Sequence, residues 1–121
     1  MINTVTPKAE RNTVLLFSRN GLGHAPDPLP QTLVAKFLSL LLESGDLPSK
    51  ILFYTDGVRL ACRGSAVLAQ LQSLEAAGVE LVLCSTCLQF LGLADQVQVG
   101  VVGGMGDILT ALQQAPKVIS L

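Results

Sequence analysis

Several features that mark common classes of protein are missing from this sequence. It has no tryptophan and only one tyrosine, so it offers no aromatic platform on which the bases of single-stranded nucleic acid could stack. Eight basic residues stand against nine acidic ones without a basic run, which disfavours nucleic acid and anionic membranes as partners. No apolar run reaches the length of a membrane span, so we expect no membrane partner.

Cysteine is also scarce, with three residues in a chain of 121. An odd number of cysteines disfavours a framework of disulfides. The first eleven residues are polar and lack the apolar centre of a signal peptide. We therefore expect a cytoplasmic protein with reduced thiols, in which residues 1–11 form a disordered tail or linker and residues 12–121 form one domain.

Hydrophobic residues make up half of the chain, which is enough for a buried core. Short aliphatic runs predict five strands, at residues 13–18, 51–55, 79–84, 97–102 and 117–121. Capping residues and the helical spacing of leucines predict helices that begin near Asp27, Ser65, Ser85 and Asp107. This alternation predicts an α/β fold, with three layers (α/β/α) around a five-stranded, mainly parallel sheet.

The clearest chemical signal lies at the end of the third predicted strand. Cys84 closes that strand, and Cys87 falls in the opening turn of the next helix. The carboxyl ends of strands are where open α/β sheets usually place their chemistry, and a helix start lowers the pKa of a thiol. We predict a reactive thiol at Cys84, with Cys87 as a second thiol that resolves it. Two buried packing residues, or dithiol redox chemistry of the thioredoxin kind, remain alternatives.

The third cysteine, Cys62, follows the second predicted strand and is flanked by Arg59 and Arg63. A nearby cation lowers the pKa of a thiol and attracts anionic substrates. The alternative is that these arginines are solvated or pair with Asp56. Because this loop lies at the same sheet edge as Cys84, we assign Arg59 and Cys62 as candidate substrate-binding residues.

Glycines shape the loop after the first predicted strand. Gly21 and Gly23 allow a tight turn and a close approach of the backbone to a site, so we assign both as candidate substrate-binding residues. The match to a nucleotide-binding loop is weak, because Pro26 stands where the third glycine would fall. Nucleotide binding remains a further alternative for this loop.

A zinc site needs four ligands, and the chain has candidates for them. Cys62, Cys84, Cys87 and His24 supply the number, but they come from three separate loops with a single C-x-x-C. We therefore expect no metal and no cofactor.

Several of these segments match one known family. The motif Cys84-x-x-Cys87-Leu88, followed by Gly92-Leu93, is the most specific of them, and Gly57-Val58-Arg59-Leu60-Ala61 and Leu74-Glu75-x-x-Gly78-Val79 support it. Residues 12–121 thereby resemble the DsrE-like domain of the YedF group, which are sulfurtransferase-like proteins of selenium metabolism.

The resemblance implies a three-layer fold, a homo-oligomer that is a trimer or hexamer, and a persulfide on the cysteine after the third strand, here Cys84. YedF proteins carry an amino-terminal TusA-like domain, whereas eleven residues precede the first strand here. We expect that domain to be missing or a separate protein, or this chain to be a fragment. The resemblance thus predicts a sulfur or selenium carrier that passes a persulfide from Cys84 to a partner thiol, with a TusA-like protein as a candidate partner. A non-catalytic oligomeric assembly module is the alternative.

Overall fold

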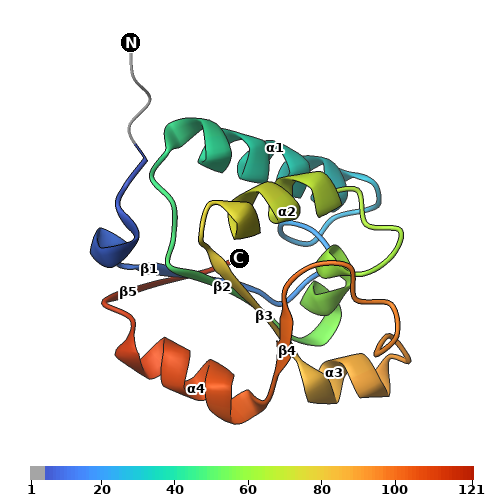
Figure 1. Ribbon diagram of the computed structural model, residues 1–121. Coiled ribbons are helices and arrows are strands. Elements are labelled where there is room, and N and C mark those ends of the chain that lie inside the picture. Colours follow the sequence, from blue (N-terminus) through green and yellow to red (C-terminus); the bar gives the residue numbers. More distant parts are fainter. Residues whose placement is uncertain (1–4) are drawn as a thin grey trace.

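Five strands form one parallel sheet in the computed structural model, which describes residues 5–121 (Figure 1). The strands are β1 (Thr13–Phe17), β2 (Lys50–Phe53), β3 (Glu80–Cys84), β4 (Val101–Gly103) and β5 (Lys117–Ser120). Their order across the sheet is β4-β3-β2-β1-β5, and every neighbouring pair is parallel. The predicted α/β fold with a five-stranded sheet is confirmed.

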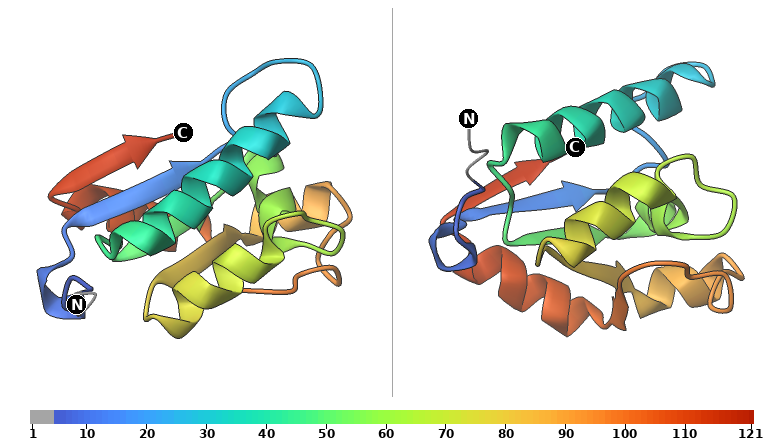
Figure 2. Two further views of the ribbon diagram at one scale, coloured as in Figure 1. Left: turned by 90° about the horizontal axis from the view of Figure 1, so that it is seen from above. Right: turned by 45° about the horizontal axis from the view of Figure 1, so that its top comes forward.

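Helices cover both faces of the sheet (Figures 1 and 2). Within residues 5–121, the four α-helices are α1 (Leu29–Ser44), α2 (Leu68–Ala76), α3 (Ser85–Phe90) and α4 (Met105–Gln114), and the two short 3-10 helices are η1 (Lys8–Glu10) and η2 (Thr55–Ala61). Helices α1 and α2 lie together on one face, and α4 lies on the other (Figure 2). Within residues 5–121, no helix has the length and apolar character that crossing a membrane requires.

Each face of the sheet has its own hydrophobic core, because side chains alternate between the two faces of a strand. Leu81 and Leu83 of β3 pack into the core under α1 and α2, whereas Val82 and Cys84 pack into the core under α4. In the first core, the stacked rings of Phe17 and Phe53 lie 5.9 Å apart. The carboxyl ends of β1 and β2 thus pack against each other through these two rings.

Glycine conformations set two element boundaries. Gly78 has a φ of 94° and ends the turn after α2, as its position in the sequence predicts. The prediction of a strand over 97–102 is partly wrong, because Gly100 has a φ of 84° and β4 begins only after it. Val97 instead forms an isolated antiparallel bridge with Cys62.

Residues 5–11 belong to the segment predicted as a disordered tail or linker, and they contact the domain. Residues 1–4 of that segment lie outside the described residues. Thr6 donates its backbone N–H to the carbonyl of Gly45 at 2.9 Å, and Arg11 Nε donates to the carbonyl of Thr6 at 3.0 Å. The first bond joins the segment to the loop after α1, and the second lies within the segment. Both satisfy backbone groups that water would otherwise solvate.

Candidate functional site

The carboxyl edge of the sheet brings two thiols together. β3 ends at Cys84 and α3 begins at the next residue, so Cys87 lies in the first turn of α3. Cys84 interacts with Cys87 through its side chain, and both contact the core under α4. All three cysteines are free thiols. The predicted pair is therefore adjacent in space and is not joined by a disulfide.

Cys84 itself is not accessible. Its exposed fraction is 0%, because it shares a strand face with Val82 and packs with Ile108 of α4. The reactive thiol at Cys84 therefore stays a prediction, and this burial does not favour it. The local pattern placed Cys84 correctly at the strand end, but the covering helix comes from more than twenty residues further along the sequence.

Cys87 is the thiol that reaches the surface. It is half-buried and lines an open cavity of about 320 Å³. The other lining residues are Thr55, Asp56, Thr86, Phe90 and Leu91. Phe90 is 89% exposed, so an apolar ring stands in solvent at the rim of the cavity. Cys87 therefore lies where a small molecule or another protein can approach it.

A backbone amide is directed at the sulfur of Cys87. Thr55 donates its N–H to Cys87 Sγ at 3.0 Å. Thr55 has a φ of 49°, which is uncommon for a residue with a branched side chain. Its hydroxyl donates to the carbonyl of Ser18 at 2.6 Å, which helps to hold this conformation. Such an amide stabilises negative charge on the sulfur.

Gly57 allows η2 to lie close enough for this contact. A Cβ atom added at Gly57 would lie 2.0 Å from the carbonyl oxygen of Phe17. Tyr54 donates its N–H to that same oxygen at 3.1 Å. The end of β1 thus sets the position of the first turn of η2, and with it the amide of Thr55.

The thiol of Cys87 is less acidic than the sequence led us to expect. Burial raises its pKa above the ordinary value of 9.0, the Thr55 amide opposes that rise, and the neighbouring Cys84 adds to it. At neutral pH the protonated thiol therefore predominates. The nucleophile must form by loss of a proton during the reaction, because the thiolate is the attacking species.

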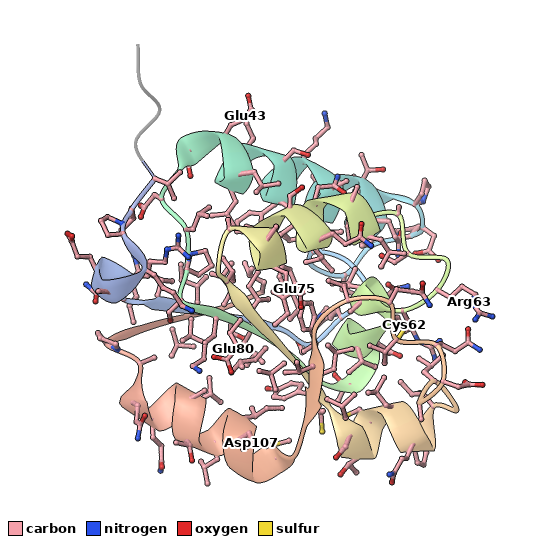
Figure 3. The ribbon with its side chains drawn as sticks, in the orientation of Figure 1. Glu43, Cys62, Arg63, Glu75, Glu80 and Asp107 are labelled. Carbon is pink, nitrogen blue, oxygen red and sulfur yellow. The ribbon has the colours of Figure 1, made fainter. Side chains whose placement is uncertain are left out.

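Cys62 is not among the residues that line the Cys87 cavity. Its exposed fraction is 2%, and its thiol donates to the carbonyl of Val58 at 3.2 Å. Burial raises the pKa of Cys62, and the positive charge of Arg59 only partly opposes the rise. Figure 3 shows Arg63 extending into solvent beside it. The prediction of Cys62 as a substrate-binding residue finds no support in this placement.

Two other predicted residues do meet in a second cavity. Gly23 and Arg59 line an open cavity of about 380 Å³ beside the loop after β1. Arg19, Asn20, His24, Ala25, Asp27, Pro30, Gln31 and Asp56 complete its walls. Arg59 Nε donates to Asp56 Oδ1 at 3.0 Å, so the predicted alternative of an Arg–Asp pair is realised. Asp56 also lines the Cys87 cavity, so the two cavities are neighbours.

Gly21 has a structural part in this second cavity. It is buried, with a φ of 146°, and an added Cβ would lie 2.6 Å from the Cβ of Pro30. Leu22 donates its N–H to the carbonyl of Pro30 at 2.9 Å. Gly21 therefore lets the loop pack closely against Pro30 at the start of α1, and Pro30 is a lining residue of this cavity.

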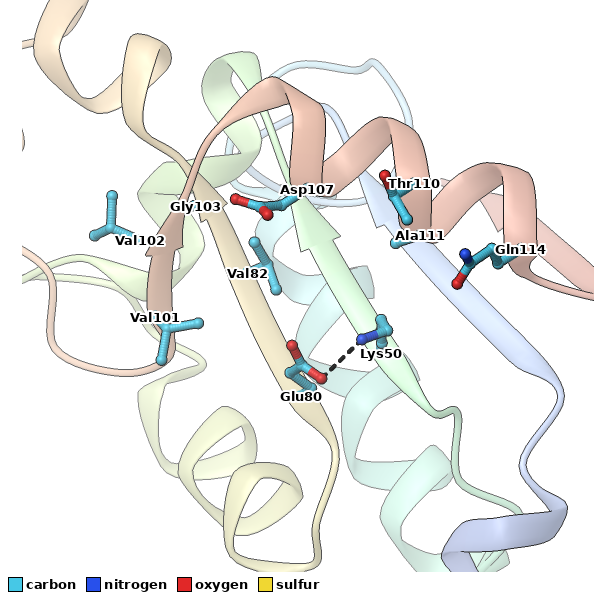
Figure 4. A pocket seen from close by; sticks show the side chains of 10 residues that line it. All are labelled: Lys50, Glu80, Val82, Val101, Val102, Gly103, Asp107, Thr110, Ala111 and Gln114. Carbon is cyan, nitrogen blue, oxygen red and sulfur yellow. Dashed lines mark hydrogen bonds and ion pairs between the residues drawn. The ribbon is translucent and has the colours of Figure 1, made fainter.

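A third cavity, of about 400 Å³, lies between the sheet and α4 (Figure 4). The sequence gives no pattern that indicates this cavity, because its polar residues are dispersed along the chain. Lys50 and Glu80 form an ion pair of 2.8 Å on its floor, and Asp107 accepts the N–H of Gly104 at 2.9 Å. Lys50, Glu80 and Asp107 thus already have partners within the protein. Within residues 5–121, no group of three or more His, Cys, Asp or Glu side chains is placed to hold a metal ion.

The fold and the site define a three-layer α/β protein with a pair of thiols at the carboxyl edge of its sheet. Residues 23–121 match the DsrE/DsrF-like family. The match spans most of the chain, and the protein therefore belongs to the DsrE/DsrF-like family.

Solved structures support the fold. The chain is similar to the protein of unknown function MTH1491 from Methanobacterium thermoautotrophicum, with a TM-score of 0.67, 22% identity, and coverage of 93% of this chain and 100% of that one. It is similar to the ychN protein from E. coli, with a TM-score of 0.68, 17% identity, and coverage of 91% and 99%. The protein BT1422 from Bacteroides thetaiotaomicron, also of unknown function, gives a TM-score of 0.63, 17% identity, and coverage of 91% and 95%. A search of curated proteins found no match.

Proposed function

We propose that this protein carries sulfane sulfur as a persulfide on the Cys84–Cys87 pair and passes it to a partner thiol. The observation that carries the proposal is the setting of Cys87. This residue lines an open cavity, its sulfur accepts a hydrogen bond from a backbone amide, and it lies beside a second thiol. The family resemblance assigns the persulfide to Cys84. Because Cys84 is buried, we assign the incoming sulfur to Cys87 and the second role to Cys84.

The proposed reaction needs no cofactor. The Cys87 thiolate attacks the outer sulfur of a donor persulfide, a new S–S bond forms, and the donor thiolate leaves with the electron pair of the broken bond. The amide of Thr55 stabilises the charge on the Cys87 sulfur before attack. An acceptor thiolate then removes the outer sulfur. Alternatively, Cys84 attacks the Cys87 sulfur, which releases hydrogen sulfide and leaves a Cys84–Cys87 disulfide.

The proposal includes self-association and protein partners. Apolar residues of β4 and α4 stand exposed near one edge of the sheet, namely Val101, Val102, Met105 and Leu109. Such a patch is typical of an interface, and we propose a homo-oligomer, a trimer or hexamer, that uses it. Phe90 at the rim of the Cys87 cavity is the proposed contact for a donor or acceptor protein of the TusA-like kind. The YedF-type role, with sulfur or selenium as cargo in the cytoplasm, is part of this proposal.

Mass spectrometry tests the carrier. The reduced protein is incubated with a sulfane-sulfur donor, and the intact mass is measured for the parent chain and for Cys87→Ser, Cys84→Ser and Cys62→Ser. We expect a gain of sulfur in the parent chain and in Cys62→Ser, and no gain in Cys87→Ser. A gain that persists in Cys87→Ser and vanishes in Cys84→Ser would show that Cys84, not Cys87, carries the persulfide.

The adjacency of the two thiols also suits dithiol redox chemistry, which is the second candidate function. In that case, the donor or a mild oxidant would convert the parent chain directly to a Cys84–Cys87 disulfide, without any species that has gained sulfur. If no variant gains sulfur and no disulfide forms, the thiols are packing residues of an assembly module. Light scattering of the parent chain and of Val102→Glu tests the oligomer, since a charge in the apolar patch is expected to release monomers.

A further inference from the structure

The second cavity, which we call the loop cavity, carries charge of both signs. Arg19 and Arg59 contribute cations, and Asp27 and Asp56 contribute carboxylates to its walls. All four side chains come from the loop after β1 and from η2, at the carboxyl edge of the sheet. This is the edge where parallel α/β sheets bind their ligands. A cavity with this distribution of charge fits a dipolar ligand better than an ion of either sign.

An unpaired acceptor adds a second observation. Gln31 Nε2 donates to the carbonyl of Asn20 at 2.8 Å, and this bond determines which way the amide group faces. Gln31 Oε1 is buried, and it has no hydrogen-bond partner among residues 5–121. A buried acceptor without a partner costs free energy. This oxygen has less than 1 Å² of exposed surface, so a ligand that donates an N–H to it must first displace the atoms that cover it.

The loop cavity also lies next to the reactive thiol. Asp56 lines both the loop cavity and the Cys87 cavity, and its neighbour Thr55 donates to Cys87 Sγ at 3.0 Å. A molecule held in the loop cavity can therefore extend a short arm past Asp56 toward the sulfur of Cys87.

We propose that the loop cavity binds the α-amino-acid group of a small persulfide, such as cysteine persulfide, and presents its sulfur to Cys87. This proposal rests on the proposed function and names the substrate class for it. The ligand's carboxylate pairs with Arg19 and Arg59, and its ammonium group donates to Asp27 and, once the atoms covering it have moved, to Gln31 Oε1. Phosphates and inorganic oxyanions have no ammonium group to pair with Asp27, which disfavours the nucleotide site considered for this loop.

The sulfur transfer balances without another reactant. The Cys87 thiol loses its proton, and its sulfur attacks the outer sulfur of the bound persulfide. The bond between the two sulfurs of the donor breaks, and its electron pair leaves with the inner sulfur. That thiolate takes up a proton and departs as the free amino-acid thiol, while Cys87 holds the outer sulfur as a persulfide.

Binding is tested with a ligand that cannot transfer sulfur. S-methylcysteine has the complete dipolar group, 3-(methylthio)propionate has only the carboxylate, and 2-(methylthio)ethylamine has only the amine. Titrations followed by NMR of the backbone amides should show S-methylcysteine binding about tenfold more tightly than either fragment, as expected for one lost charge-assisted hydrogen bond. Signals of residues 19–31 and 56–59 should shift. Equal affinity of the three compounds would overturn the proposal.

Loading kinetics test the same site with a matched control. Arg19→Gln should slow the loading of Cys87 from cysteine persulfide by about tenfold and leave loading from inorganic polysulfide unchanged, since polysulfide has no amino-acid group. Arg63→Gln removes an exposed arginine outside the cavity and should change neither rate. Equal slowing with both donors, or none with either, would overturn the loop cavity as the binding site. If neither donor loads Cys87 in the parent chain, the proposed function itself fails, while the binding of S-methylcysteine is still measured independently.

Discussion

Cys62 and Cys87 occupy comparable places in the chain, yet the structure gives them opposite settings. Each follows a strand at the carboxyl edge, and burial raises the pKa of each thiol. Cys62 donates its hydrogen to the Val58 carbonyl inside the core, whereas Cys87 accepts the Thr55 amide and faces a cavity. A sulfur that accepts a hydrogen bond is prepared to hold negative charge, and a thiol that donates one is held in its protonated form. Exposure and the direction of the hydrogen bond therefore separate a chemical cysteine from a structural one.

The largest expected difference between the two regions is in their reaction with an alkylating agent. Cys87 should react with iodoacetamide in the native protein, whereas Cys62 can react only in molecules whose core has opened. Because core opening costs several kcal/mol, we expect Cys87 to react at least about a thousandfold faster. Peptide mapping after timed alkylation measures both rates. Comparable rates would show that the core around Cys62 is open in solution.

The support of the Cys87 site is tested at Gly57. Gly57→Ala places a Cβ 2.0 Å from the Phe17 carbonyl oxygen, so η2 must shift, and we expect a loss of about 3 kcal/mol in the free energy of unfolding. Gly106→Ala is the matched control, because an added Cβ there meets no atom of residues 5–121 within 4 Å apart from its chain neighbours and the backbone of its own helix. As a helical position of α4, it should gain about 0.5–1 kcal/mol. Urea denaturation measures both changes, and equal stability of the two variants would contradict the close packing of η2 on β1.

The smallest expected effect is the dependence of stability on alkaline pH. The thiols of Cys62 and Cys87 have a pKa raised above 9.0 in the folded protein, so folding favours their protonated forms. This contribution is complete below pH 9.0 and is lost as the pH rises through the folded pKa values. The free energy of unfolding should therefore fall above that pH, and it should fall less steeply in Cys62→Ala. An equal slope in the two proteins would show that the pKa of Cys62 is not raised.

The pH dependence of Cys87 alone sharpens the comparison further. Cys84 raises the pKa of Cys87, so Cys84→Ala should move the midpoint of Cys87 alkylation to lower pH. The same substitution should leave the reactivity of Cys62 unchanged, because Cys62 lies in the other core cluster. Alkylation rates measured across a pH series report the midpoint. A midpoint that moves upward would mean that Cys84 stabilises the thiolate of Cys87.

Local patterns in the sequence were enough to predict much of the fold. The apolar runs of β1 and β3 and the glycine after α2 indicate their elements through propensities that act within a few residues. The C-x-x-C motif likewise indicates a thiol pair at a strand end. The beginning of β4 was missed, because the left-handed conformation of Gly100 depends on its contact with Leu81 and Leu83 of the neighbouring strand.

The sequence by itself determined the parallel α/β architecture and the presence of two thiols at the carboxyl edge of the sheet, since both depend on short-range periodicity. Only the tertiary structure decided that Cys84 is covered and Cys87 is open, and that Gly23 and Arg59 line one cavity. Burial and cavities arise where segments distant in the sequence pack together, as α4 does over Cys84. No pattern of neighbouring residues contains that information.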